Sequence, residues 1–305
     1  MSSAEFIPPM LQGVSASKVF LKPSPDAIHR IYDYLCAQFP HIEAAEWRQR
    51  FQDGLIYDAH GLKLQAHSPF QANSHVFYYR FLKHEIHVPF EHQILFENED
   101  LMVIDKPHFL TMSPTGQYVQ ETLLVRLKNQ TGIEQLTPIH RLDRETAGIV
   151  LFSKRAESRG AYQQMFAERQ VQKAYHAIAP YAPELEFPQT VRLRMDKGEP
   201  FYTMQVTAGA PNSETEIQLL AQHGAWAKYL LKPHTGKQHQ LRVHLNALGL
   251  PIRNDPFYPQ VAHKAEDDFS QPLQLLAKHI EFKDPLSLQA MQFSSKQDLN
   301  LELTL

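Results

Sequence analysis

The sequence predicts an α+β fold with a mixed, mostly antiparallel sheet, preceded by a small helical module. After about residue 93, strand-like and helix-like stretches follow one another in mixed order, and four strand-length runs occur between residues 190 and 231 without a helix. Such an order is typical of α+β domains rather than of doubly wound sheets. The 305 residues suffice for two domains, and we expect a module over residues 1–90 and a larger domain over residues 91–305.

The N-terminal module is predicted to contain two helices and a hairpin. The first helix is expected to begin at Ser24 as its cap, with Pro25 at the first helical position, and to end at Pro40. The second is expected over residues 43–52, where the spacing of the apolar residues is helical. A turn sequence between two short apolar runs predicts the hairpin over residues 55–64.

The larger domain is predicted to alternate between the two kinds of element. The last four predicted strands are separated by turn-rich segments, which favours an antiparallel meander. We expect strands at residues 94–97, 101–105, 148–154, 173–180, 190–195, 202–207, 214–221 and 225–231, and helices at residues 119–130, 156–169 and 238–248.

The charge of the chain is distributed unevenly. The net charge of −3 excludes the overall basicity of many nucleic-acid-binding proteins. However, residues 228–253 contain five Lys and Arg and no acid, which gives +5, whereas residues 255–305 contain four Lys and eight acids, which gives −4. The segment around Arg242 can therefore attract phosphates even though the whole chain is slightly acidic.

Cys36 is the only cysteine, so the sequence permits no intrachain disulfide and none of the zinc sites that are built on paired cysteines. The first residues do not combine a basic start with an apolar run, and nowhere do about 18 apolar residues follow one another. We expect a cytoplasmic protein that is not associated with a membrane.

Two polar stretches are candidates for chemistry. Residues 139–148 form a charged loop that leads into an apolar strand, and a rigid strand can fix a reactive carboxylate at its start. By composition alone such a loop is most often a solvated turn. In the second stretch, residues 232–245, His239 and His244 lie five residues apart, not four as for two ligands on one helical face. We therefore expect no metal site.

Several motifs together resemble a known family. They are His140–Thr146, Glu168–Tyr175 and Gly236–Leu245, with further matching segments at residues 105–116, 249–258 and 275–285. In this order they resemble the RluA-like pseudouridine synthases over about residues 93–290, and an ordered set is far more specific than one motif. The resemblance implies the pseudouridine synthase catalytic fold, with its central sheet flanked by helices. It also implies an isomerase that converts uridine to pseudouridine in structured ribosomal or transfer RNA without a cofactor.

The motif positions imply roles for individual residues. The resemblance makes Asp143 the catalytic carboxylate, Tyr175 the active-site tyrosine and Arg242 the basic partner of the aspartate. An ionised carboxylate can attack the sugar or the base, or assist elimination, and a neighbouring arginine keeps it ionised and orients it. Tyrosine offers a flat face for an extruded base. We expect the RNA itself to be contacted by six further residues, His140, Arg141, Arg144, Lys237, His239 and Lys106.

Two other functions are open at this point. One is a catalytically inactive RNA-binding relative of the same family. The other is a phosphodiesterase that uses His239 and His244. The N-terminal module resembles, in layout, the S-four-type RNA-binding domain that many family members carry, either as a degenerate copy or as a packing module. The protein is expected to act as a monomer.

Overall fold

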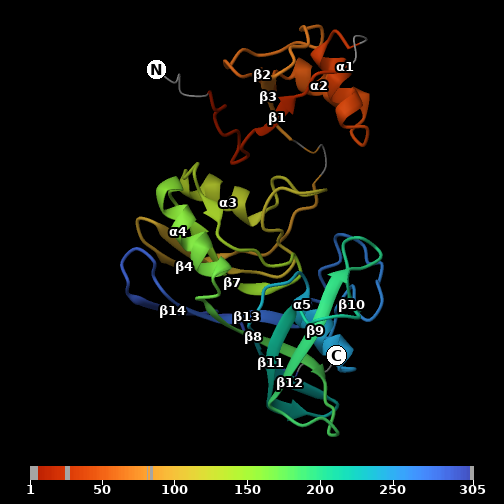
Figure 1. Ribbon diagram of the computed structural model, residues 1–305, viewed down its shortest axis with the longest axis vertical. Coiled ribbons are helices and arrows are strands. Elements are labelled where there is room, and N and C mark those ends of the chain that lie inside the picture. The colour runs from red at the N-terminus through yellow and green to blue at the C-terminus, as the bar shows by residue number, and fades with distance from the viewer. Residues whose placement is uncertain (1–5, 25–27, 81, 83–84, 303–305) are drawn as a thin grey trace. The chain divides into compact units, whose positions relative to one another are not determined.

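The computed structural model describes residues 6–24, 28–80, 82 and 85–302, and the chain forms two compact units (Figure 1). The smaller unit comprises residues 1–85, 115–120 and 125–134, and the larger unit comprises residues 86–114, 121–124 and 135–305. The two later stretches of the smaller unit lie outside the predicted 1–90 module. The division falls within helix α3 (Leu123–Thr131).

The smaller unit consists of two helices packed on a three-stranded antiparallel sheet. The helices are α1 (Ile31–Gln38) and α2 (Ala44–Gln52), and the strands follow the order β1 (Ser17–Leu21), β3 (Ser74–Tyr78) and β2 (Ile56–Asp58). Leu35, Trp47 and Ile56 are fully buried in their common core. Burial of large apolar side chains between the helices and the sheet is what stabilises this arrangement.

One prediction for this unit is wrong in detail, and another is confirmed. Helix α1 begins at Ile31 with Arg30 as its N-cap, so Ser24 does not cap it, and Pro25 lies outside the described residues. The predicted hairpin forms, with backbone hydrogen bonds between β2 and residues 62–64 on both sides of the Tyr57–Lys63 bridge. The other edge of β2 pairs with β3, a partner that the sequence analysis did not predict.

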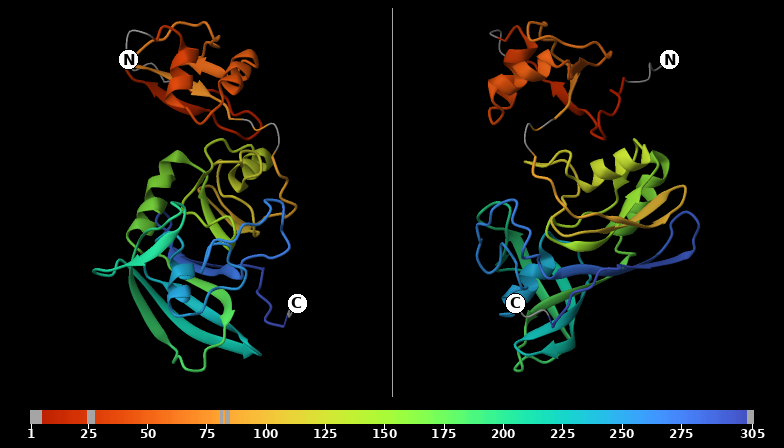
Figure 2. Two further views of the ribbon diagram at one scale, coloured as in Figure 1. Left: turned by 90° about the vertical axis from the view of Figure 1, so that its right-hand side faces the viewer. Right: turned by 180° about the vertical axis from the view of Figure 1, so that it is seen from behind.

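The larger unit is built on one eleven-stranded sheet, in which β13 joins two halves (Figures 1 and 2). The strands run in the order β10-β9-β11-β12-β8-β13-β7-β5-β4, with β14 beside β13 and β6 beside β7. Their bounds are β4 (Gln93–Glu97), β5 (Leu101–Lys106), β6 (Thr137–Pro138), β7 (Ala147–Ser153), β8 (Gln172–Pro180), β9 (Gln189–Lys197), β10 (Met204–Thr207), β11 (Ser213–His223), β12 (Trp226–Pro233), β13 (Leu275–Lys283) and β14 (Ala290–Ser294).

The junction between the halves requires a glycine. Strands β13 and β7 run parallel, with Ala277 opposite Gly148. A Cβ atom at Gly148 would lie 2.3 Å from the carbonyl oxygen of Ala277, and the φ of Gly148 is +110°. Only glycine permits both the close approach and this backbone conformation.

Each half of the sheet has its own helix and core. Helix α4 (Ala156–Ala167) places Tyr162 and Met165 against the apolar residues of β5 and β7. Helix α5 (Gln240–Ala247) places Leu241 and Leu245 against β8, β11 and β12. The α+β class with a mostly antiparallel sheet is confirmed.

The predicted meander is antiparallel, but its strand order is different. Strand β11 pairs with β9 rather than with β10, so the β9–β10 hairpin projects at the edge of the sheet. Helix α5 also begins two residues later than predicted, because His239 adopts a left-handed conformation with a φ of +53°. Among the described residues, no helix combines the length and apolar character needed to cross a membrane.

Candidate active site

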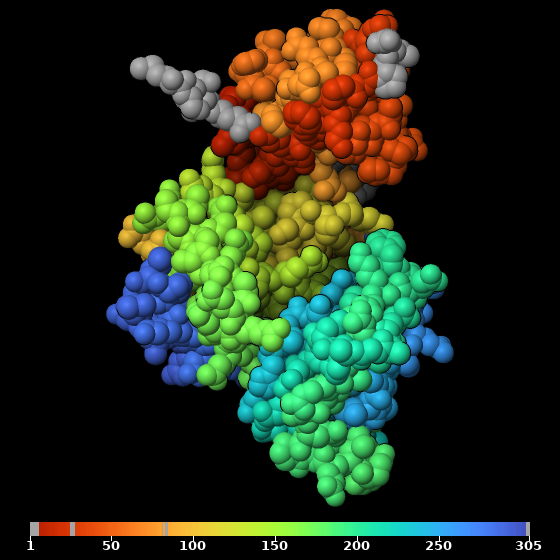
Figure 3. All heavy atoms as spheres, in the orientation of Figure 1, coloured from red at the N-terminus to blue at the C-terminus, as the bar shows by residue number. Residues whose placement is uncertain are grey.

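The three predicted motifs line one cavity of about 1090 Å³ within the larger unit. Its walls come from residues 140–143, Thr146 and residues within 166–175 and 232–242, with Leu275, His279 and Glu281 completing them. The space-filling view shows the hollow between the green segments near residue 165 and the teal segments near residue 200 (Figure 3). Segments that are far apart in the sequence thus form a single concave site, the usual geometry of a ligand pocket.

Asp143 lies in this cavity on the loop that precedes β7. Its carboxylate is 25% exposed, and its Oδ2 atom is 3.4 Å from Nη1 of Arg242. The backbone N–H of Thr146 donates to the carbonyl of Asp143, which closes the loop directly before the strand. The rigid start of β7 therefore presents the carboxylate to the cavity.

Arg242 is held by a second carboxylate that the sequence analysis did not identify as a site residue. The guanidinium donates to Asp255 through Nε at 2.8 Å and Nη2 at 2.6 Å, and it lies over the rings of Phe257 and Tyr258. Asp255 has no exposed side-chain surface. Burial disfavours the charged form of Arg242, but the hydrogen bonds and charge of Asp255, with Asp143, outweigh it and raise the pKa. Arg242 is therefore a fixed cation beside Asp143.

Tyr175 lies on β8 and lines the same cavity. Burial raises the pKa of its phenol, and the negative charge of Asp143 raises it further. A phenol with a raised pKa is a poor base at neutral pH. The aromatic face of Tyr175 is therefore the more useful part of this side chain.

His140 and Arg141 line the cavity in different ways. The ring of His140 stacks on Phe166 with the centroids 4.5 Å apart, and Nε2 accepts the N–H of Leu151. Burial, with a contribution from the charge of Lys173, lowers the pKa of His140 to about 3. His140 is thus a neutral wall residue and cannot bind phosphate as a cation, whereas Arg141 is exposed at the rim.

Lys106 and Arg144, both predicted RNA contacts, do not line the cavity. Lys106 is fully buried, and its ammonium donates to the carbonyls of Pro107, Leu110 and Arg144 at 2.9–3.1 Å. The guanidinium of Arg144 contacts the carboxylate of Glu145. The assignment of Lys106 to RNA binding is therefore corrected, because its ammonium fixes the catalytic loop from inside.

Lys237 and His239 both line the cavity. Lys237 is exposed, while His239 is buried, with Nδ1 2.8 Å from the hydroxyl of Tyr258. His244, in contrast, is completely buried, and its Nε2 contacts Ser213. The two imidazoles do not face one substrate, so the geometry contradicts the phosphodiesterase alternative.

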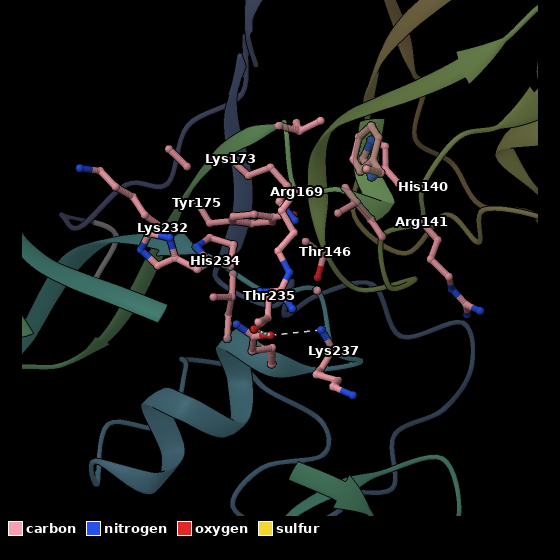
Figure 4. A pocket seen from close by; sticks show the side chains of 18 of the residues that line it. His140, Arg141, Thr146, Arg169, Lys173, Tyr175, Lys232, His234, Thr235 and Lys237 are labelled. Atoms are coloured by element: carbon pink, nitrogen blue, oxygen red, sulfur yellow. Dashed lines mark hydrogen bonds between the residues drawn. The ribbon is translucent and has the colours of Figure 1, made fainter. Parts of the chain in front are cut away.

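Two cationic residues of the cavity were missed by the sequence analysis. Arg169 and Lys173 line it, and among the described residues neither side chain has a hydrogen-bond or ion-pair partner. In Figure 4, Arg169 extends toward the middle of the cavity, whereas Arg141 and Lys237 point toward its rim. Lys173 could have been found, because side chains two residues apart on a strand face the same side and Tyr175 was already assigned.

The predicted positive segment is only partly used by the cavity. Lys232, Lys237 and Arg242 line it, but Lys228 pairs with Asp298, and Arg253 lies over the ring of Trp226. Within the described part of the chain, no group of three or more His, Cys, Asp or Glu side chains is placed to hold a metal ion.

Comparison with known proteins identifies the family. The sequence pattern of the RNA pseudouridylate synthase family matches residues 100–247. An RNA pseudouridine synthase of Mycoplasma genitalium is 30% identical over 224 residues, which cover 70% of this chain and 71% of that protein. The chain belongs to the RNA pseudouridine synthase family.

Other similarities agree with this identification. Human pseudouridylate synthase RPUSD2 is 35% identical over 177 residues, which cover 56% of this chain but only 31% of the human protein. The solved structure of human RNA pseudouridylate synthase domain containing 4 is 25% identical, covers 67% of this chain and 88% of that one, and has a TM-score of 0.54. The predicted pseudouridine synthase family and its catalytic fold are confirmed.

Proposed function

We propose that this chain isomerises uridine to pseudouridine in a structured RNA, with Asp143 as the catalytic carboxylate. The observation that supports this most strongly is the position of Asp143. Its carboxylate is partly exposed in the cavity, 3.4 Å from the buried Arg242, and Tyr175 lines the same space. A fixed cation beside a carboxylate keeps the carboxylate pointing in one direction.

The reaction has no net change in composition. The bond between N1 of uracil and C1′ of the ribose breaks, the base turns, and a bond forms between C5 and C1′. The hydrogen on C5 leaves as a proton, and N1 gains one. Asp143 can form a covalent bond with the sugar or the ring, or it can remove a ribose proton to start an elimination. The face of Tyr175 can stack on the uracil while it turns.

The cations of the cavity support binding of a phosphate backbone. Arg141, Arg169, Lys173 and Lys237 line it without side-chain partners among the described residues. A uridine within a helix must leave its stack to reach Asp143, so the flanking phosphates would pass these side chains. We propose transfer or ribosomal RNA as the substrate and a cytoplasmic monomer as the active form.

The decisive experiment measures both the product and its dependence on Asp143. Purified protein is incubated with RNA from cells that lack the enzyme, and pseudouridine is mapped. The release of tritium from uridine labelled at C5 gives the rate. We expect new pseudouridine with the wild type and none with Asp143→Asn. An Asp143→Asn variant as active as the wild type would exclude the proposed role of this carboxylate, and RNA binding without any pseudouridine would favour the inactive relative.

A further inference from the structure

A chain of polar contacts leads from the β9–β10 hairpin to the carboxylate of Asp143. The backbone N–H of Met204 donates to the hydroxyl of Tyr258 at 2.8 Å. The same hydroxyl is 2.8 Å from Nδ1 of His239, and Nε2 of His239 is 3.7 Å from Oδ2 of Asp143. Tyr258 and His239 are both buried.

The first contact determines where the protons lie. Because an N–H can only donate, the oxygen of Tyr258 accepts from Met204. The phenol proton then has His239 Nδ1 as its acceptor, and a buried hydroxyl proton without an acceptor would be costly. Burial also lowers the pKa of His239, which keeps its imidazole neutral. A neutral imidazole that accepts at Nδ1 carries its hydrogen on Nε2, the atom that faces Asp143.

The two donors near Asp143 lie close to the same oxygen atom of its carboxylate, Oδ2. Arg242 uses Nε and Nη2 for Asp255 and has Nη1 left for Asp143. Nη1 donates to Oδ2 at 3.4 Å, and His239 Nε2 lies 3.7 Å from the same atom, a close contact that is longer than a hydrogen bond. Among the described residues, no donor contacts Oδ1. The carboxylate is therefore held by one oxygen and open at the other.

We propose that His239 is a positioning residue that, together with Arg242, holds Oδ2 of Asp143, so that Oδ1 is the oxygen that reacts. The inference rests on the proposed function, and it assigns Tyr258 the task of fixing the tautomer of His239. Directional control of this kind affects the chemical step more than substrate binding, because a misplacement of about 1 Å can cost a reaction about 100-fold.

The matched pair of variants His239→Gln and His239→Asn tests this assignment. The amide nitrogen of glutamine reaches about as far as Nε2 and can still donate to Asp143. The shorter asparagine ends near the position of Nδ1 and keeps only the contact with Tyr258. We expect His239→Asn to lower kcat about 10- to 100-fold with KM nearly unchanged, and His239→Gln to retain most of the activity.

Two more variants complete the series. Tyr258→Phe removes the proton that fixes the tautomer, so it should lower kcat, but it should lower it no further when combined with His239→Asn. His223→Asn changes an exposed histidine at the end of β11 and should leave kcat unchanged. Thermal unfolding of each variant shows whether it is folded. Equal loss of kcat in His239→Gln and His239→Asn, or wild-type kcat in His239→Asn, would overturn the assignment.

A measurement without RNA tests the tautomer directly. Nitrogen-15 NMR of the histidine-labelled protein at pH 7 should show His239 with its hydrogen on Nε2, the signal being assigned by its loss in His239→Gln. A hydrogen on Nδ1 would overturn the proposal even if the enzyme is active. Absence of pseudouridine formation by the wild type would instead overturn the proposed function, so the two failures can be told apart.

Discussion

Charged side chains at the centre of the cavity have protein partners, whereas those at its rim have none among the described residues. At the centre, Arg242 is 1% exposed, and its donors are shared between Asp255 and Asp143. At the rim, Arg141 and Lys237 have no side-chain hydrogen-bond or ion-pair partner in the described part of the chain. The centre is therefore complete before any ligand arrives, whereas the rim is complete only when a polyanion supplies its missing charges.

This difference separates two tasks. A preorganised carboxylate needs no rearrangement during the chemical step, so changes at the centre should lower kcat. Cations that lack partners gain most when phosphates reach them, so changes at the rim should raise KM and alter the salt dependence. This comparison would be contradicted if variants at the centre mainly raised KM, or if variants at the rim mainly lowered kcat.

The largest effect should come from Asp143→Asn. We expect kcat to fall by at least about 1000-fold, because the amide can neither attack nor act as a base. The change is nearly isosteric and partly exposed, so the unfolding temperature should change little. Asp267→Asn, at an exposed position outside the cavity, is the control and should retain full activity.

Arg242→Lys should affect both rate and stability. Lysine keeps the charge but cannot donate in a fork to Asp255, which leaves a buried carboxylate poorly paired. We expect kcat to fall about 100-fold and the free energy of unfolding in urea to fall by about 3 kcal/mol. Arg192→Lys breaks a similar fork to Glu214 at the surface, where solvent screens the pair, and should cost much less. Equal losses in the two variants would show that burial of the centre is unimportant.

Low pH should destabilise the folded protein, because the buried His140 resists protonation. Its pKa of about 3 lies below the value of about 6.5 in an unfolded chain, so below pH 6.5 the unfolded state takes up a proton that the folded state does not. Stability therefore falls as the pH falls from 6.5 toward 3. Between pH 7 and pH 5, His140→Gln should remove up to about 2 kcal/mol of this loss in urea unfolding experiments. An unchanged pH dependence in His140→Gln would contradict this account.

The smallest effect should come from the rim. Arg141→Gln or Lys237→Gln should raise KM about 10-fold, leave kcat within about 2-fold, and reduce the slope of log affinity against log salt by about one. Lys283→Gln, at the end of β13 and outside the cavity, serves as the control. A fall in kcat without a change in KM would place these cations in the chemistry instead.

The sequence predicted the class of fold and the convergence of three motifs better than it predicted individual contacts. Asp143, Tyr175 and Arg242 line one cavity as expected, although their roles in catalysis are still predictions. Lys106 was expected to contact RNA, which requires an exposed side chain, but it is fully buried. Its burial depends on three carbonyls from two loops, and no local pattern shows where those carbonyls will lie.

Non-local pairing explains the other differences. Strand β11 pairs with β9 rather than with the preceding strand β10, and Asp255 reaches Arg242 from a separate loop. The left-handed conformation of His239 could not be read from its residue type either, since glycine or asparagine is usual there. These features depend on contacts between distant segments, and the periodicity of the sequence does not show such contacts.

The place of β13 in the sheet has a consequence for the making of the protein. This strand is synthesised well after both of its neighbours, yet it lies between β8, which bears Tyr175, and β7, which follows Asp143. While the ribosome is still adding residues before 275, the two halves of the sheet have no strand to join them. A nascent chain should therefore gain its catalytic geometry only after β13 has been made, and RNA that it meets earlier should leave unmodified.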